Sequence, residues 1–404
     1  MQYVWGLLGV VGLLAIAFLL SENKRRIRWR TVLGALAIQL LFGFIVLKWT
    51  AGREVLNAIS GGVSSIISYA NEGVAFVFGS AIPAAGQGFV FAFQVLSVIV
   101  FFSALIAVLY HLHIMQWIIR LIGGGLSRLL GTSKAESLSA TANIFVGQIE
   151  APLVIKPYLD RMTRSEMFTV MAGGMASVSG SVMAGYALIG VPLNYLIAAS
   201  FMAAPAGLLV SKLLIPETEI SETSKEVTVQ QDDTSANVID AAARGAVDGV
   251  QIAIAVAATL IAFIGLIALV NGLLGGVGSW FGMPTLSLQG ILGFLFAPIA
   301  FLIGVPWSET ILAGSLIGQK IIINEFVAFS ELVKIQSQLS DRSFMIAAFA
   351  LCGFANLSSI AMQISGISAI APNRRSIITE LGFRSVLAGT IANLLSASIA
   401  GMFY

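Results

Sequence analysis

Repeated apolar runs, many of them long enough to cross a lipid bilayer, constrain this sequence more than any other feature. A transmembrane helix needs about 20 apolar residues, and clear candidates lie at roughly 3–20, 31–49, 88–111, 192–214, 248–271 and 383–402. Two further apolar regions, 165–190 and 343–370, are rich in Gly, Ser and Asn, and each is predicted to be one broken span. Only 10% of the 404 residues are charged, whereas soluble domains have about 25%. The sequence therefore predicts an all-α polytopic membrane protein with eight transmembrane helices, two of them broken.

Composition argues against several other classes of protein. The formal net charge is +2, and no basic patch is interleaved with aromatic residues, so nucleic acid is not expected as a partner. Cys352 is the single cysteine, which excludes an intrachain disulfide and a cysteine-built metal site. No nucleophile motif, metal-ligand cluster or nucleotide loop supports an enzyme. The basic cluster "KRRIRWR" follows the first apolar run instead of preceding it, so residues 1–20 are read as a retained span.

Lysine and arginine in short loops predict the orientation of the chain in the membrane. The basic segments are 24–30, 120–134, 161–164 and 373–384, and they share the cytoplasmic side if both termini lie outside. Residues 52–70 and 115–130 are amphipathic and are predicted to lie along the membrane surface. Residues 217–240 form one acidic, hydrophilic insert, expected to be a cytoplasmic loop.

Two apolar regions, 133–158 and 286–318, are interrupted near their middles by "VGQIEAP" and "IGVPWSE". Gly and Pro break helices, so each region is predicted to be a re-entrant hairpin. Each is followed by a broken span and an intact span, an order that indicates an inverted repeat and places a transport site at the interruptions. The predicted divisions are an N-terminal scaffold (1–130), a first repeat (131–214), a cytoplasmic loop with an interfacial helix (215–247), a scaffold span (248–285) and a second repeat (286–404).

The intramembrane polar residues gather at these interruptions. They are Asn143, Gln148, Glu150, Ser177, Ser179, Ser181, Ser308, Glu309, Asn356, Ser358 and Ser359. Carboxylates and amides without Arg or Lys suit a neutral, polyhydroxylated ligand. Amide and hydroxyl oxygens beside unwound backbone suit a hard cation such as Na⁺, and Asn143 with Ser177 is the expected pair.

The motifs "GQIEAP", "NEGVAFVFG", "GVPWSE" and "GFANLSS" resemble signatures of the concentrative nucleoside transporter family in its bacterial eight-span form. The similarity covers nearly the whole chain. It implies a homotrimer in the bacterial cytoplasmic (inner) membrane, with a scaffold domain and a transport domain that moves as an elevator. It also implies uptake of nucleosides, such as uridine and adenosine, driven by a cation gradient.

The resemblance also implies roles for individual residues. Gln148 and Glu150 would contact the nucleobase beside Val182. Glu309, Asn356 and Ser359 would hold the ribose hydroxyls, with Phe354 near the sugar. Na⁺ would bind the side chains of Asn143 and Ser177 and the carbonyls of Val146 and Val178. Many relatives have Thr or Ser where this chain has Ile149, which removes a hydroxyl near the base.

Several alternatives remain open. H⁺ could replace Na⁺ as the coupling ion, although the presence of Asn143 favours Na⁺. Glu150 and Glu309 could each cap a hairpin helix instead of binding substrate. A channel, with hairpins lining a continuous pore, and a membrane-embedded enzyme using the two carboxylates are the other classes.

Overall fold

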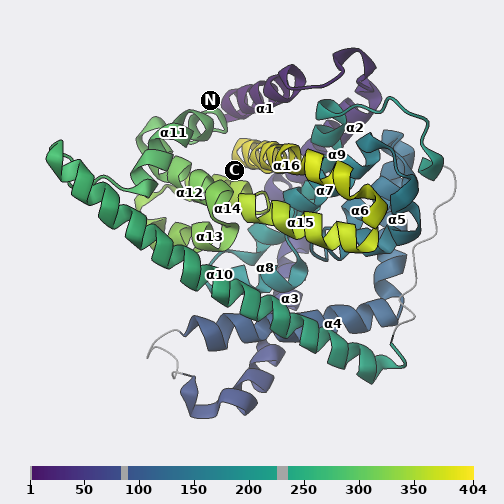
Figure 1. Cartoon of the computed structure of the whole chain (residues 1–404), viewed down its shortest axis with the longest axis horizontal. Coiled ribbons are helices and arrows are strands. Elements are labelled where there is room, and N and C mark those ends of the chain that lie inside the picture. Colours follow the sequence, from purple (N-terminus) through teal and green to yellow (C-terminus); the bar gives the residue numbers. More distant parts are fainter. Residues whose placement is uncertain (1, 83–89, 225–234) are drawn as a thin grey trace.

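The computed structural model describes residues 2–82, 90–224 and 235–404, and within these ranges the chain is helical with no strand (Figure 1). The sixteen α-helices are α1 (Gln2–Leu19), α2 (Trp29–Gly43), α3 (Thr50–Phe78), α4 (Ser97–His111), α5 (Ile114–Leu130), α6 (Lys134–Ala142), α7 (Arg164–Ala176), α8 (Gly180–Leu188), α9 (Leu193–Leu214), α10 (Val238–Trp280), α11 (Leu288–Leu302), α12 (Thr310–Ile322), α13 (Glu325–Lys334), α14 (Asp341–Leu351), α15 (Leu357–Ile370) and α16 (Arg375–Phe403). A long 3₁₀ segment, η5 (Ala151–Arg161), and shorter turns join them.

Seven helical segments of the described chain are long and apolar enough to cross a membrane. They are Gln2–Leu19, Trp29–Lys48, Ala92–His111, Arg164–Leu188, Leu193–Leu214, Val238–Trp280 and Pro372–Phe403. The eighth predicted span, 343–370, is divided into α14 and α15, and neither half reaches the length of a span on its own. Both spans that were predicted to be broken are interrupted, at 177–179 and at 352–356.

The breaks are stabilised by side-chain caps. Ser179 accepts a hydrogen bond from the Val182 backbone N–H at the start of α8, and Asn356 accepts one from Ser359 at the start of α15. Ser and Asn favour such N-cap positions because their oxygens bond N–H groups that have no partner in the helix. Each span is therefore two shorter helices, and the break exposes backbone groups in the interior of the protein.

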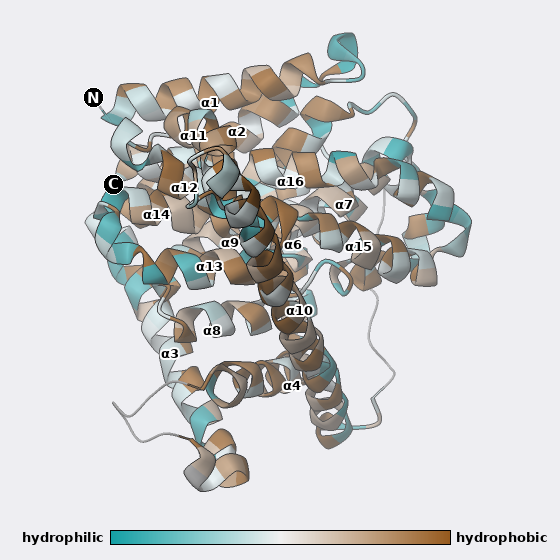
Figure 2. Ribbon diagram, turned by 60° about the vertical axis from the view of Figure 1, so that its left-hand side comes forward, coloured by the Kyte–Doolittle hydropathy of each residue, from teal (hydrophilic) through white to brown (hydrophobic). Residues whose placement is uncertain are grey.

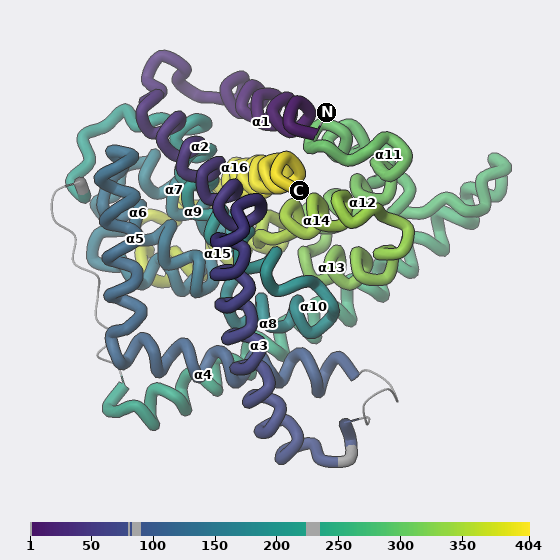
Figure 3. Tube along the Cα trace, turned by 180° about the vertical axis from the view of Figure 1, so that it is seen from behind, coloured from purple at the N-terminus to yellow at the C-terminus, as the bar shows by residue number. Residues whose placement is uncertain are grey.

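The central helices are enclosed by protein, whereas the outer ones expose apolar surface. α7, α8, α9 and α16 are mostly buried, whereas only a small share of α1, α4 and especially α10 is buried. Figure 2 shows α10 as a long, strongly hydrophobic rod on one face, and Figure 3 shows α3 crossing the opposite face. A helix that is apolar all round and poorly covered by protein is typical of a lipid-facing span.

The second half of the fold repeats the element order of the first. In the first half, the hairpin α6–η5 precedes the broken pair α7–α8 and then α9; in the second half, α12–α13 precedes α14–α15 and then α16. α16 packs against α7, α9 and α14 at the centre of the molecule. The two sets of breaks therefore lie around one shared core.

The predicted boundaries of the second hairpin were wrong. "IGVPWSE" does end a helix, and Gly304 has a φ of 106° there, but the turn joins α11 to α12, which pack side by side. The tip that matches "VGQIEAP" is Ile323–Asn324, between α12 and α13. Asn324 makes this break as an N-cap that accepts from the Val327 N–H at 2.9 Å. The tip, Ile323–Asn324, contains neither Gly nor Pro, so the helix-breaking signal used to find the first tip was absent here.

Candidate functional site

A cavity of about 630 Å³ opens where the two hairpin tips and the two helix breaks meet the flank of α10. Clefts of about 300–1,000 Å³ accommodate small-molecule ligands, so a nucleoside-sized molecule fits the volume. The hairpins contribute Gln148, Glu150 and Glu325, and the breaks contribute Val182, Phe354 and Asn356. α10 closes the remaining side with apolar side chains and with the polar side chains of Asp248, Gln251 and Thr259.

Seven of the eight residues predicted to contact substrate line this cavity. They are Gln148, Ile149, Glu150, Val182, Phe354, Asn356 and Ser359. Their elements are separated by about half the chain, so the repeat architecture brings them together. The apolar side chains of Val182 and Phe354 suit the faces of an aromatic base or the carbon skeleton of a sugar.

The first hairpin tip supplies one buried amide, Gln148, and one exposed carboxylate, Glu150. Gln148 is buried, and its Oε1 makes no hydrogen bond within the described chain. A Cβ at Gly147 would lie 2.4 Å from Glu150 Oε2, so the missing side chain lets the carboxylate fold back over the tip. A buried polar atom without a partner is costly, and Gln148 Oε1 is therefore placed to bind a ligand.

The structure corrects the prediction for Glu309. This carboxylate is outside the cavity and accepts from the Ser340 backbone N–H at 3.2 Å and from the Ser340 hydroxyl at 3.0 Å. Ser340 is the N-cap of α14, so Glu309 ties the start of α12 to the start of α14. The motif match put Glu309 at a hairpin tip, whereas the actual tip lies fifteen residues further along the chain.

Glu325 is the functional candidate that the sequence reasoning missed. It begins the second leg of the second hairpin, as Glu150 precedes the second leg of the first. The Tyr186 hydroxyl donates to its Oε1 at 2.9 Å and the Asn356 side-chain amide donates to its Oε2 at 3.0 Å. The signal was available in "IIINEFVAF", where a carboxylate interrupts an apolar run, the criterion that identified Glu150.

Asn356 and Ser359 lie beside Glu325 at the second break. Asn356 Oδ1 accepts from the Ser359 backbone N–H at 2.8 Å and from the Ser358 hydroxyl at 2.7 Å. The Ser359 hydroxyl is buried and has no hydrogen-bond partner in the described residues. A carboxylate, an amide and an unpaired hydroxyl in contact with one cavity can exchange hydrogen bonds with vicinal hydroxyl groups.

The predicted cation ligands gather just behind the first hairpin tip. Asn143 Nδ2 donates to the Ser139 carbonyl at 3.1 Å, and its buried Oδ1 has no hydrogen-bond partner in the described chain. Ser177 is the C-cap residue that follows α7, and it is also buried. A Cβ at Gly173 of α7 would lie 3.4 Å from Asn143 Nδ2, so the hairpin tip and α7 touch.

Val146 and Val178, the residues with predicted carbonyl ligands, are buried in the non-helical backbone of the tip and the break. The atoms available as cation ligands are amide, hydroxyl and carbonyl oxygens, which suit a hard cation. The orphaned oxygen of Asn143 is the observation that fits a cation, because hydrogen bonds do not saturate it. The four predicted ligand residues therefore lie in one region of the structure, and the cation site there stays a prediction.

Comparisons with known proteins cover the whole chain. Residues 8–81 match the family described as the N-terminus of Na⁺ dependent nucleoside transporters, residues 92–193 match a family described as nucleoside recognition, and residues 195–401 match the C-terminus of Na⁺ dependent nucleoside transporters. An uncharacterized transporter, YutK of Bacillus subtilis, is 57% identical over all of both chains. The nucleoside permease NupC of Helicobacter pylori is 49% identical, over 99% of this chain and 97% of that protein.

Solved structures agree with these relatives. CNTnw in an inward-facing, substrate-bound state has a TM-score of 0.95 and 56% identity, over 100% of this chain and 98% of that one. A variant of CNTnw in an outward-facing state has a TM-score of 0.97, with the same identity and coverage. The human solute carrier family 28 member 3 is 37% identical, over 98% of this chain and 59% of that protein.

Proposed function

This chain belongs to the concentrative nucleoside transporter family, and from that premise we propose that it imports nucleosides such as uridine and adenosine by symport with Na⁺. It is a nucleoside transporter, a multi-pass membrane protein and not an enzyme. The family description "Na⁺ dependent" supports sodium as the coupling ion. H⁺ coupling in the same fold is the alternative that the experiments below separate from it.

The observation that carries this proposal is the cavity between the hairpin tips and the helix breaks, with a carboxylate on each tip. Gln148 and Glu150 are proposed to bind the nucleobase, beside Val182 and Ile149. Glu325, Asn356 and Ser359 are proposed to bind the ribose, with Phe354 packing against the sugar. Glu325 takes the role expected of Glu309, because it reaches the cavity and Glu309 does not.

Ion and nucleoside binding are proposed to be coupled through the first hairpin tip. Asn143 and Gln148 are separated by a short non-helical segment, so a cation held by Asn143 would fix the backbone that positions Gln148 and Glu150. Fixing a segment that a second ligand also needs gives positive coupling between the two. The cation is cargo in this scheme and travels with the nucleoside.

The elevator mechanism, the homotrimer and the orientation are also proposals. The hairpins, broken spans, α9 and α16 would form the transport domain, and the exposed outer helices would form the scaffold in the bacterial inner membrane with both termini outside. Solved relatives in inward-facing and outward-facing states support alternating access. The exposed apolar surface of α10 supports contact with lipid or with further copies of the chain.

Uptake of labelled uridine and adenosine into proteoliposomes tests the function. We expect accumulation under an inward Na⁺ gradient and little uptake when choline replaces Na⁺. Absence of uptake of either nucleoside under the Na⁺ gradient would contradict the proposal, and uptake driven by a pH gradient without Na⁺ would select the H⁺ alternative. Competition by purine and pyrimidine nucleosides would then define base preference at Ile149.

A further inference from the structure

Lys320 is a buried cation to which the proposed function gives no role. It lies on α12, three residues before the tip residue Ile323, and its side chain is fully buried. Its ammonium donates to the Ala350 carbonyl at 2.9 Å and to Asn393 Oδ1 at 2.6 Å. No carboxylate of the described chain forms an ion pair with it, although the charge of Glu325, at the edge of the cavity, acts on it. A charge in such a position is costly and is a functional candidate by default.

The acceptors of Lys320 are placed to stabilise a positive charge. Ala350 lies in the last turn of α14, which ends at Leu351, and unpaired carbonyls at a helix C-terminus carry partial negative charge. Asn393, from α16, donates its Nδ2 to the Ala176 carbonyl at 2.6 Å and to the Cys352 carbonyl at 2.9 Å. Ala176 is the last residue of α7, so one amide joins both helix breaks and Lys320 binds that amide.

The approach of Asn393 depends on the backbone at the second break. A Cβ at Gly353 would lie 2.3 Å from Asn393 Oδ1, closer than real Cβ atoms approach another atom. The break therefore leaves room for the amide to reach both carbonyl ends and still present Oδ1 to the ammonium. This arrangement is a built cation site with oxygen ligands from α14 and α16.

Its position in the second repeat corresponds to that of the proposed Na⁺ site in the first. In the first repeat, Asn143 at the end of α6 touches α7 just before the helix breaks. In the second repeat, Lys320 near the end of α12 bonds α14 just before that helix breaks. The first site offers an orphaned amide oxygen, whereas the second already holds an ammonium.

We propose that the Lys320 ammonium is a resident cation that takes, in the second repeat, the place of the coupling ion in the first, so that one Na⁺ accompanies each nucleoside. This inference rests on the proposed Na⁺ symport. A tethered ammonium neutralises the carbonyl ends at the second break, requires no dehydration from solution, and moves with the protein in both directions of the cycle. It therefore contributes no ion to the coupling.

The test measures how many Na⁺ ions bind with one nucleoside. The Na⁺:nucleoside flux ratio of the unaltered protein is determined in proteoliposomes, and the Na⁺ dependence of uridine binding is titrated in detergent. Lys320→Met removes the charge and Lys320→Arg keeps it. Lys334→Met is the matched control, because Lys334 is exposed and pairs only with the nearby Glu331.

We expect a ratio of about one for the unaltered protein, Lys320→Arg and Lys334→Met, read from the slope of log affinity against log Na⁺. For Lys320→Met the slope should rise to about two, because the vacated oxygen site then takes a second Na⁺. A purely structural lysine would change stability without changing this slope. If the Lys320→Met variant can be purified as folded protein only at high Na⁺, and not when choline replaces Na⁺, that dependence also supports the inference.

Several results would overturn it. One is a Na⁺:nucleoside ratio of two in the unaltered protein. Another is a folded Lys320→Met variant that binds one Na⁺ or none. The third is a Lys320→Met variant that fails to fold at every Na⁺ concentration while Lys320→Arg folds. Failure of the proposed function looks different, since the unaltered protein would then show no Na⁺-dependent nucleoside uptake at all. A Na⁺-dependent transporter with a ratio of two would reject only the role of Lys320.

Discussion

At the scale of single residues, the contacts of Glu325 and Glu309 show which of these two carboxylates can reach the ligand cavity. Glu325 lines the cavity with Asn356, whereas Glu309 binds the cap of α14. We expect Glu325→Gln to weaken nucleoside binding by about tenfold or more, because hydrogen bonds to a charged group contribute about 1.5–3 kcal/mol. Glu309→Gln should change binding by about twofold or less, as for substitutions remote from the site. Titration calorimetry with uridine on both variants measures this, and the reverse ranking would contradict the assignment.

Gly147 gives a second prediction at this scale. A Cβ there would lie 2.4 Å from Glu150 Oε2, so Gly147→Ala must displace the carboxylate proposed to bind the base. We expect nucleoside affinity to fall by about tenfold, the equivalent of one hydrogen bond. Gly124→Ala is the matched control, since a Cβ at Gly124 meets no other atom within 4 Å. Equal affinities for the two variants in the same binding assay would show that Glu150 does not contact the nucleoside.

The predicted residues that line the cavity share a physical signal. Gln148 and Glu150 stand beside Gly and Pro in an apolar run, and Asn356 lies in a segment of small polar residues. Each combines an expensive polar group with a helix breaker. Glu325 lacks the second part of that signal, because an Asn cap alone forms its tip. Lys320 and Asn393 lie within unbroken helices, so only tertiary packing brings them into contact.

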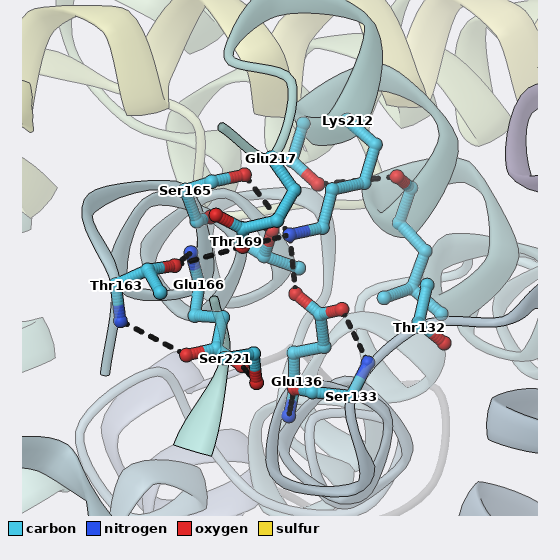
Figure 4. Close-up of polar contacts among 12 residues, drawn as sticks. Thr132, Ser133, Glu136, Thr163, Ser165, Glu166, Thr169, Lys212, Glu217 and Ser221 are labelled. Atoms are coloured by element: carbon cyan, nitrogen blue, oxygen red, sulfur yellow. Dashed lines mark hydrogen bonds and ion pairs between the residues drawn. The ribbon is translucent and has the colours of Figure 1, made fainter. Parts of the chain in front are cut away.

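At the scale of elements, a buried polar cluster fixes the base of the first hairpin (Figure 4). Glu136 closes a capping box with Ser133 at the start of α6, and Glu166 closes one with Thr163 at the start of α7. Lys212 from α9 pairs with Glu136 at 2.6 Å. These contacts join the first hairpin, the broken span and the intact span of one repeat.

The segment after α9 closes over this cluster. Glu217 is 3.7 Å from the Lys212 ammonium, and Ser221 and Thr223 each donate to Glu166 Oε1 at 2.5 Å. The predicted hydrophilic insert 217–240 therefore begins with ordered contacts, and its central part, 225–234, lies outside the described residues. Sequence composition identified the insert as polar, but it could not show that its first residues serve as hydrogen-bond donors and acceptors for α7 and α9.

Lys212→Met is expected to destabilise the protein strongly. It would leave the buried Glu136 carboxylate without its cation, and loss of one partner of a buried pair costs about 3–5 kcal/mol. Thermal unfolding in detergent measures the effect. Lys334→Met removes a lysine of similar length from an exposed pair and should leave the melting temperature nearly unchanged. Adding Glu136→Gln should recover part of the lost stability, and no recovery would contradict the ion-pair explanation.

At the scale of the whole molecule, the order of elements was predictable from the sequence. The segment of the second half that corresponds to the first hairpin tip was not. Apolar runs and their interruptions follow from solvation in lipid, so the spans, both broken spans and the repeat were read from the sequence. The second hairpin was displaced because a turn between two packed helices, α11 and α12, carries the same Gly-Pro signal as a hairpin tip. Only packing distinguishes the two.

Coupling belongs to this scale, because it connects an ion gradient to a nucleoside site through one hairpin. Asn143 offers the orphaned oxygen for the cation and lies a few residues before Gln148. We expect Asn143→Ala to abolish stimulation of uridine uptake by Na⁺, a loss of about 5–150-fold for typical coupling energies. Uridine binding without Na⁺ should remain close to that of the unaltered protein. Uptake by Asn143→Ala that still responds fully to Na⁺ would place the coupling ion elsewhere, and full uptake driven by a pH gradient would assign the coupling to H⁺.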